Sequence, residues 1–85
     1  MQIIFHIFFK KKFKKLPKKI QNQFYKRLQL FENDKFNSLL NNYSVEKRFP
    51  NCRSINITGD YRVIFKEEQG GLFIFLNIGT HSELY

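Results

Sequence analysis

Residues 72–85 have the sequence LFIFLNIGTHSELY, and this stretch decides the fold. Its first part, Leu72–Ile78, is apolar on both alternating faces, which is typical of a central strand that is covered on both sides. His81 and Tyr85 follow it after Gly79. Chain ends are usually polar and poorly ordered. A titratable and an aromatic side chain directly after a strand therefore predict that both lie at one end of the sheet.

Two strand patterns precede this stretch. Residues 53–58 and residues 61–66 alternate between apolar and polar side chains, with the turn dipeptide Gly59-Asp60 between them. Residues 67–71 predict a hairpin loop before the last strand. The three strands are expected to form an antiparallel meander.

The first half of the chain predicts one strand and two helices. Residues 2–7 are β-branched and aromatic, and residues 8–16 place apolar side chains at helical spacing among five lysines. Pro17 interrupts the pattern and suits the first turn of a second helix over residues 17–32. Residues 35–51 are read as loop.

The predicted fold class is α+β. We expect one domain over residues 1–85, in the order strand, helix, helix and three strands. The sheet would have four strands and be mainly antiparallel, with the two-helix hairpin packed on one face. The other face would remain for function.

Composition restricts the class of partner. The chain has 85 residues, 11 of them Phe, and a formal net charge of +8. A folded domain this basic repels itself, so nucleic acid, an anionic membrane surface and an acidic protein are the candidate partners. The single cysteine makes neither a disulfide nor a zinc site. No signal sequence or membrane span is recognisable, so we expect a cytoplasmic protein with no cofactor and no metal.

The strand pairing predicts which side chains gather. With a loop centred near residues 69–70, Arg62 would lie across from Asn77 and Ile64 across from Phe75. Ser54 or Asn56 on the preceding strand would share the face of Arg62. The groups expected at this end of the sheet are Asp60, Arg62, Asn77, His81 and Tyr85, with Lys47 and Arg48 on the preceding loop.

These residue types suit cleavage of an RNA backbone without a metal. A histidine can move protons near neutral pH, a guanidinium matches phosphate oxygens, and a tyrosine can stack on an unpaired base. Structural alternatives stay open: His81 as a solvated residue, Arg62 paired with Asp60 or Glu83, Asp60 as a turn residue and Tyr85 as a cap on the core.

The segment RSINITGDYRVIF, residues 53–65, and the ending IGTHSELY, residues 78–85, resemble the RelE/ParE superfamily of bacterial toxins. The resemblance is strongest to its RelE/YafQ-like mRNA interferase branch, and it covers nearly the whole chain. It implies the RelE-like fold and a ribosome-dependent endoribonuclease that cuts mRNA and so inhibits translation. It also implies an antitoxin from the same operon, and contacts between the basic helices and 16S rRNA.

The resemblance also implies roles for individual residues. His81 matches the catalytic histidine, Arg62 the arginine that stabilises phosphate charge, Tyr85 the terminal aromatic and Asp60 a candidate base. The residues implied to contact RNA are Lys47, Arg48, Arg53, Asn56 and Asn77. Two positions depart from the YafQ-like branch: Asn56 stands in place of a histidine and Asn77 in place of an arginine. Tyr43 aligns loosely with another histidine, so the proton acceptor stays unassigned.

Two other functions remain open from the sequence. The first is a ParE-like toxin of the same fold that inhibits DNA gyrase and cuts nothing. The second is a non-catalytic basic module that binds RNA or a membrane surface. The combination of Arg62, His81 and Tyr85 favours the nuclease, because a toxin that only binds has no need of a histidine there.

Overall fold

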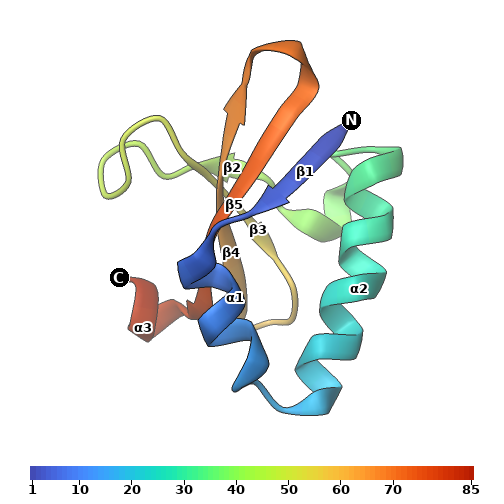
Figure 1. Cartoon of the computed structure of the whole chain (residues 1–85), viewed down its shortest axis with the longest axis vertical. Coiled ribbons are helices and arrows are strands. Elements are labelled where there is room, and N and C mark those ends of the chain that lie inside the picture. Colours follow the sequence, from blue (N-terminus) through green and yellow to red (C-terminus); the bar gives the residue numbers. More distant parts are fainter.

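The computed structural model describes the whole chain, residues 1–85 (Figure 1). The strands are β1 (Gln2–Phe5), β2 (Tyr43–Ser44), β3 (Arg53–Asn56), β4 (Tyr61–Glu68) and β5 (Leu72–Thr80). The α-helices are α1 (Ile7–Lys14), α2 (Lys18–Asn33) and α3 (His81–Leu84), and two short 3-10 helices are η1 (Ser38–Leu40) and η2 (Gln69–Gly71). No helix is both long and apolar enough to cross a bilayer.

The sheet is mixed and has five strands in the order β1-β5-β4-β3-β2. The predicted four-stranded, mainly antiparallel sheet with two helices is therefore wrong. β1 pairs with β5 in parallel, whereas the other three pairings are antiparallel. The sequence does not predict the fifth strand, β2, because two residues are too few to show an alternating pattern. The sequence does not predict the third helix either, because the four residues of α3 form a single turn and are too few to show helical periodicity.

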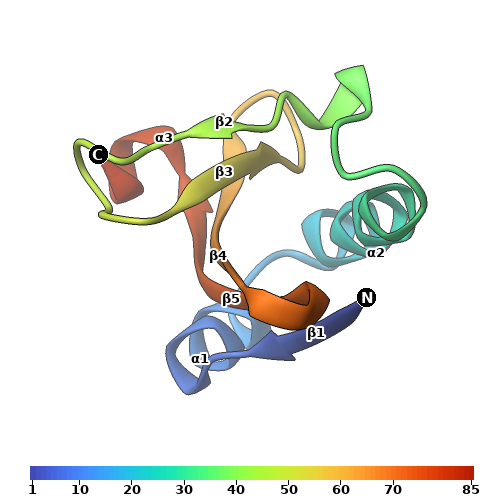
Figure 2. The same ribbon diagram turned by 90° about the horizontal axis from the view of Figure 1, so that it is seen from above.

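The helical hairpin of α1 and α2 covers one face of the sheet, which curves around α2 (Figure 2). Phe9 from α1 and both Phe24 and Phe31 from α2 are buried there. They meet Phe65 from β4 and Phe75 from β5, and the ring centroids of neighbouring pairs lie 5.2–6.1 Å apart. Phenylalanine thus forms most of this main core, as its abundance in the sequence predicts.

A second, smaller core covers the opposite face. Val45 and Cys52 from the β2–β3 loop are buried together there with Ile64 from β4 and Leu84 from α3. Burial raises the pKa of the Cys52 thiol above its ordinary value. The face that was expected to be open is therefore partly closed, and only its rim is available for function.

The β4–β5 pairing differs from prediction by two residues. Arg62 lies across from Gly79, and Ile64 lies across from Asn77. One residue of the shift comes from the loop, because Glu68 pairs with Leu72 and residues 69–71 close the hairpin. The other comes from a bulge between residues 64 and 65 of the ladder. Before the bulge the shift is even, so Arg62 and Asn77 stay on one face, as predicted. Beyond the bulge the shift is one residue, so Phe75, which was predicted across from Ile64, pairs with Phe65 and lies in the main core instead.

Candidate functional site

Arg62 forms the centre of a polar group on the rim of the second core. Its Nη1 donates hydrogen bonds to Asn56 Oδ1 at 2.5 Å and to Tyr43 Oη at 3.2 Å. The guanidinium carbon also lies 5.7 Å from the centre of the Tyr43 ring. The ion pairs of the chain, Lys35–Glu67 and Lys66–Glu68, do not involve it. The positive charge of Arg62 is thus held in place by neutral groups and remains available to an anion.

Tyr85 packs beside this arginine. Its ring centroid lies 4.8 Å from that of His81 and 5.8 Å from that of Phe49. Burial raises the pKa of the Tyr85 phenol and the Tyr43 hydroxyl adds to the rise, while the Ser54 hydroxyl and the Arg62 charge lower it by less. The phenol therefore stays protonated at neutral pH and cannot act there as a phenolate base.

His81 is the first residue of α3, and its ring is exposed beside Tyr85. Its backbone N–H donates to the carbonyl of Asp60 at 3.0 Å, which ties the end of β5 to the β3–β4 turn. Gly79 lies within β5, one residue before its end. A side chain there would stand 3.1 Å from Lys12 Nζ and 3.2 Å from Glu83 Oε1, so glycine allows this close approach.

Three buried polar atoms in this group lack a hydrogen bond of good geometry: Ser54 Oγ, Arg62 Nε and Tyr85 Oη. The Tyr43 and Ser54 hydroxyls lie close enough to the Tyr85 phenol to shift its pKa, but not in the geometry of a hydrogen bond. Buried polar atoms are nearly always paired, so a group of unpaired ones indicates either strain or a ligand site. No other buried side-chain oxygen or nitrogen of the chain is unpaired. The unsatisfied hydrogen-bonding capacity thus coincides with the position of the predicted site.

The structure brings together most, but not all, of the predicted residues. Asn56 contacts Arg62 directly, while Asn77 shares its face and accepts a hydrogen bond from the Ile78 N–H at 2.9 Å. Asp60 reaches the group only through its backbone; its carboxylate is exposed and makes no hydrogen bond or ion pair. Lys47 and Arg48 are exposed on the β2–β3 loop beside Tyr85.

Arg53 is placed away from this group. It pairs with Phe65 of the main core, on the helix side of the sheet. Its Nε donates to Asn42 Oδ1 at 2.7 Å, and its guanidinium carbon lies 5.5 Å from the centre of the Phe36 ring. Alternation along β3 explains the difference, because Arg53 is an odd number of residues from Asn56.

Two members of the group were named from the sequence but were given no role in the site. Tyr43 supplies both a hydroxyl and an aromatic ring to Arg62, and Ser54 lies across from it on β3. Alternation predicts Ser54 on this face, but Tyr43 is reached only by a two-residue strand. No group of three or more His, Cys, Asp or Glu side chains has the arrangement of a metal site.

The helix that carries His81 and Tyr85 is fixed by a capping box. Thr80 Oγ1 accepts a hydrogen bond from the Glu83 N–H, and Glu83 Oε1 accepts one from the Thr80 N–H at 2.7 Å. The Thr80 amide is the largest cause that lowers the pKa of Glu83, followed by the Thr80 hydroxyl, with a smaller contribution from Lys12. A lowered carboxyl pKa means that the folded state favours the ionised form.

We expect α3 to fray in acid. Because the folded pKa of Glu83 is below the unfolded one, its contribution is complete above the ordinary value of 4.5 and is lost as the pH falls through the folded value. The measurement is amide hydrogen exchange of Thr80 and Glu83 between about pH 6 and about pH 3, corrected for intrinsic rates. The Glu83→Ala protein should exchange fast throughout, and acid-independent protection in the unaltered chain would contradict the expectation.

Comparison with known proteins identifies the family. The family model described as ParE toxin of the type II toxin-antitoxin system, parDE, matches residues 3–85. The chain belongs to this toxin family. The resemblance to the RelE/ParE superfamily is thereby confirmed, and the chain is a type II toxin. No curated protein sequence matches it significantly.

Solved structures show the same fold at low identity. YafQ from E. coli strain BL21(DE3) is 19% identical with a TM-score of 0.80, covering 99% of this chain and 97% of that one. A YoeB/ParE toxin from Agrobacterium tumefaciens is 10% identical with a TM-score of 0.77, covering 95% and 99%. The RelB-RelE antitoxin-toxin complex from Methanococcus jannaschii gives 22% identity and a TM-score of 0.74, covering 96% and 94%.

Proposed function

We propose that this toxin is an endoribonuclease that cuts mRNA on the ribosome without a metal and so inhibits translation. The observation that carries the proposal is the group of Arg62, Tyr85 and His81 on one rim of the sheet. A cation held by neutral partners, an aromatic ring and an exposed imidazole supply three of the roles in backbone cleavage by the 2′-hydroxyl: charge stabilisation, stacking and proton donation. All 85 residues would act as a single domain.

Each side chain takes one role in the proposed reaction. The 2′-hydroxyl loses a proton as its oxygen attacks phosphorus, and the departing 5′-oxygen gains one. Arg62 contacts the phosphate and stabilises the charge that grows on it. His81 is the proton donor to the departing oxygen. Tyr85 supplies a stacking surface. It is not the base, because its raised pKa keeps the phenol protonated.

The group that accepts the proton of the 2′-hydroxyl is either Asp60 or a group of the ribosome. Asn56 cannot exchange a proton, and in this structure it instead orients Arg62. Glu83 is held in the capping box of α3 and Glu46 is hydrogen-bonded to the Asn51 N–H, whereas the exposed carboxylate of Asp60 has no partner. We propose Asp60 as base or orienting group. An acceptor supplied by the ribosome is the alternative that an Asp60→Asn protein would distinguish.

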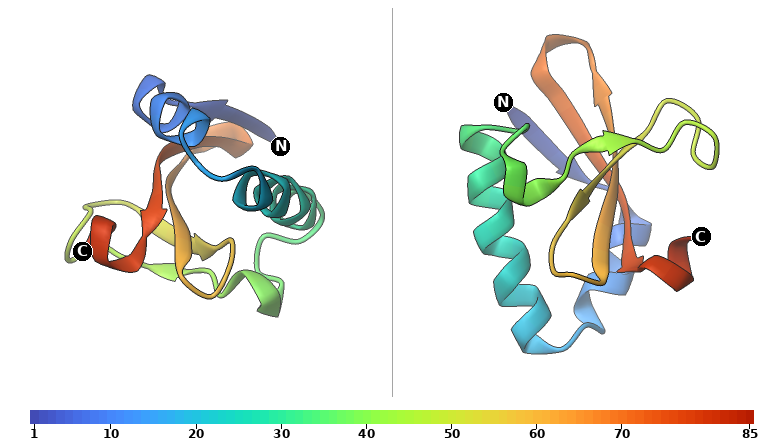
Figure 3. Two further views of the ribbon diagram at one scale, coloured as in Figure 1. Left: turned by 90° about the horizontal axis from the view of Figure 1, so that it is seen from below. Right: turned by 180° about the vertical axis from the view of Figure 1, so that it is seen from behind.

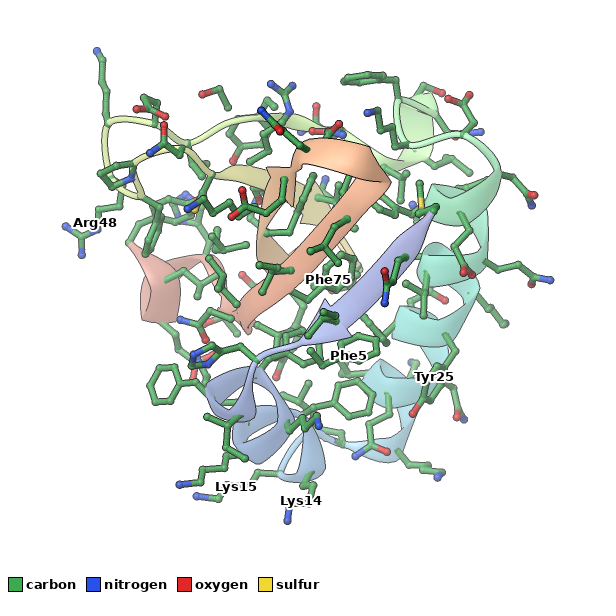
Figure 4. The ribbon with its side chains drawn as sticks, turned by 45° about the horizontal axis from the view of Figure 1, so that its top comes forward. Phe5, Lys14, Lys15, Tyr25, Arg48 and Phe75 are labelled. Atoms are coloured by element: carbon green, nitrogen blue, oxygen red, sulfur yellow. The ribbon has the colours of Figure 1, made fainter.

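The basic helices suit contact with ribosomal RNA. The lysines of α1 include Lys10, Lys11, Lys12 and Lys14, and Lys15 follows directly. Lys14 and Lys15 point outward from the body of the protein (Figure 4). Such exposed cations bind a phosphate backbone without reading sequence. We propose that this face holds the toxin on 16S rRNA in the cytoplasm while Arg62 acts on the mRNA.

The toxin family and a cavity next to α1 both support an antitoxin as a partner of this chain. YafQ and RelE are each solved in complex with an antitoxin, DinJ and RelB respectively. In this chain a cavity of about 480 Å³ between β1, α1 and α2 has an aromatic floor that includes Phe5 and Tyr25, with lysines around it. We propose that the cognate antitoxin places an acidic amphipathic segment there, because apolar floor and basic rim match one.

The proposal predicts that His81→Ala reduces cleavage by roughly 10²- to 10⁴-fold, the range of a lost general acid. The measurement is mapping of mRNA 5′ ends on ribosomes programmed with a defined message. The matched control is His6→Ala, because His6 is the other histidine of the chain and caps α1 by accepting the Phe8 N–H. Cleavage by the His81→Ala protein at the rate of the control would overturn the proposed role.

The second candidate is a toxin that binds DNA gyrase and cuts nothing, because the matching family description names ParE. The same experiment separates the two. A nuclease produces new mRNA 5′ ends in phase with codons, whereas a gyrase inhibitor produces none and instead stops supercoiling by purified gyrase.

A further inference from the structure

A second cavity opens beside the proposed catalytic group. It measures about 400 Å³ and is lined by Ser44, Val45, Glu46, Lys47, Arg48 and Tyr85. We name it the loop pocket. The β2–β3 loop and α3 lie at the same end of the molecule in both views of Figure 3. Its volume lies within the range of about 300–1,000 Å³ that is usual for small-ligand sites.

The wall of the loop pocket is held in place by its own hydrogen bonds. The Val45 N–H donates to the Cys52 carbonyl at 3.1 Å, and the Phe49 N–H donates to the Val45 carbonyl at 2.8 Å. Asn51 closes the loop in the left-handed region, with φ of 64°. Val45 and Cys52 are buried in the second core. A ligand would therefore not have to order this loop on binding.

Glu46 is an unexpected residue in such a wall. A surface that binds only RNA phosphates gains nothing from a carboxylate, yet Glu46 lies next to Lys47 and Arg48. Neither cation forms an ion pair with it. Its Oε2 accepts the Asn51 N–H at 2.5 Å, which fixes the carboxylate to the loop, and its Oε1 accepts no hydrogen bond.

We propose that the loop pocket holds a guanine base of the RNA beside the cut phosphate, and that Glu46 reads its hydrogen-bond donors. The inference rests on the proposed function, because it names the substrate nucleotide of that site. The ring of Tyr85 supplies the stacking surface that single-stranded RNA requires. Lys47 and Arg48 supply charge for the flanking phosphates, and Arg48 extends outward at the edge of the loop (Figure 4).

Guanine fits because of its donors. Its Watson–Crick edge presents two adjacent N–H donors, N1–H and N2–H₂, which match the two oxygens of a carboxylate. Adenine, cytosine and uracil each present one donor group on that edge. A carboxylate only accepts, and each oxygen can accept more than one hydrogen bond, so the Asn51 N–H does not exclude the base. A good two-point contact discriminates between bases by about tenfold or more.

The test measures binding without cleavage. Fluorescently labelled 2′-O-methyl RNAs of sequence UUGUU, UUAUU, UUCUU and UUUUU lack the attacking hydroxyl, and their affinities for the full chain follow from anisotropy. We expect UUGUU to bind about tenfold more tightly than UUUUU. In the Glu46→Gln protein the difference should fall below about twofold, because the amide accepts the Asn51 N–H but cannot accept both donors of guanine.

The matched control is Glu32→Gln, which makes the same change of charge on the exposed side of α2. It should keep the guanine preference, and equal melting temperatures should show that both variants are folded. Equal affinities for the four RNAs, or a preference that survives Glu46→Gln, would overturn the inference. A preference for UUGUU in a protein that cuts no mRNA would instead uphold the pocket and overturn the proposed function.

Discussion

Replacing Arg62 by alanine is expected to lower mRNA cleavage by about 10²- to 10³-fold, the usual loss when one preorganised charge donor is removed. The reason is its position: Asn56 and Tyr43 hold the guanidinium before substrate arrives, and no acid neutralises it. Such a cation acts on charge that develops in the transition state, so the rate constant should fall more than binding. Cleavage on programmed ribosomes and growth after induction both measure this.

The control is Arg53→Ala, since both arginines were predicted to act on RNA and they lie on neighbouring strands. Arg53 is held by Asn42 on the opposite face. We expect its removal to change cleavage by less than about threefold, the size of a weak surface effect. Arg62→Lys should recover only part of the loss, because an ammonium cannot make the two-pronged phosphate contact. Equal activity of the two alanine variants would show that the site is elsewhere.

The sequence predicts which face each side chain of β3 and β4 occupies better than it predicts which residues pair across the strands. Alternation along residues 53–58 and 61–66 placed Asn56 and Arg62 on one face, and the pairing of β3 with β4 agrees. This succeeds because the side-chain period of a strand is local. The pairing register of β4 with β5 depends on the length of the hairpin loop and on bulges. The sequence does not reveal the bulge that shifts the pairing between residues 64 and 65.

The missing parts of the site come from long-range contacts. Tyr43 is 19 residues from Arg62 in sequence, and it reaches the arginine only because a two-residue strand pairs with the edge of β3. The loop that closes the second core has no periodic pattern, so it reads as irregular. Its hydrogen bonds to Val45 and the burial of Cys52 are visible only in three dimensions.

Phe75→Ala should have the largest effect on stability. Phe75 has no exposed surface and lies at the middle of β5, where it is paired with Phe5 of β1 and Phe65 of β4. Its ring centroid is 5.6–6.1 Å from those of five other phenylalanines: Phe5, Phe9, Phe24, Phe31 and Phe65. Both helices and both neighbouring strands thus contact this one ring.

Removing a buried phenylalanine side chain usually lowers the free energy of unfolding by about 3–5 kcal/mol. At about 0.05–0.15 kcal/mol per residue, a domain of 85 residues has a total of roughly 4–13 kcal/mol. We therefore expect the Phe75→Ala protein to be partly or wholly unfolded at 37 °C and to lose cleavage for that reason. Urea denaturation followed by circular dichroism measures the loss.

The matched control is Phe8→Ala, the same substitution at a side chain of α1 that is 56% exposed. It should change the free energy of unfolding by no more than about 0.5 kcal/mol. A loss below about 1.5 kcal/mol for Phe75→Ala would mean that the core collapses into the space left by the ring, and that the packing of the other five phenylalanines around Phe75 does not stabilise the sheet. Arg62→Ala, by contrast, should lower cleavage in a protein that still unfolds cooperatively, because Arg62 lies outside the main core on the opposite face.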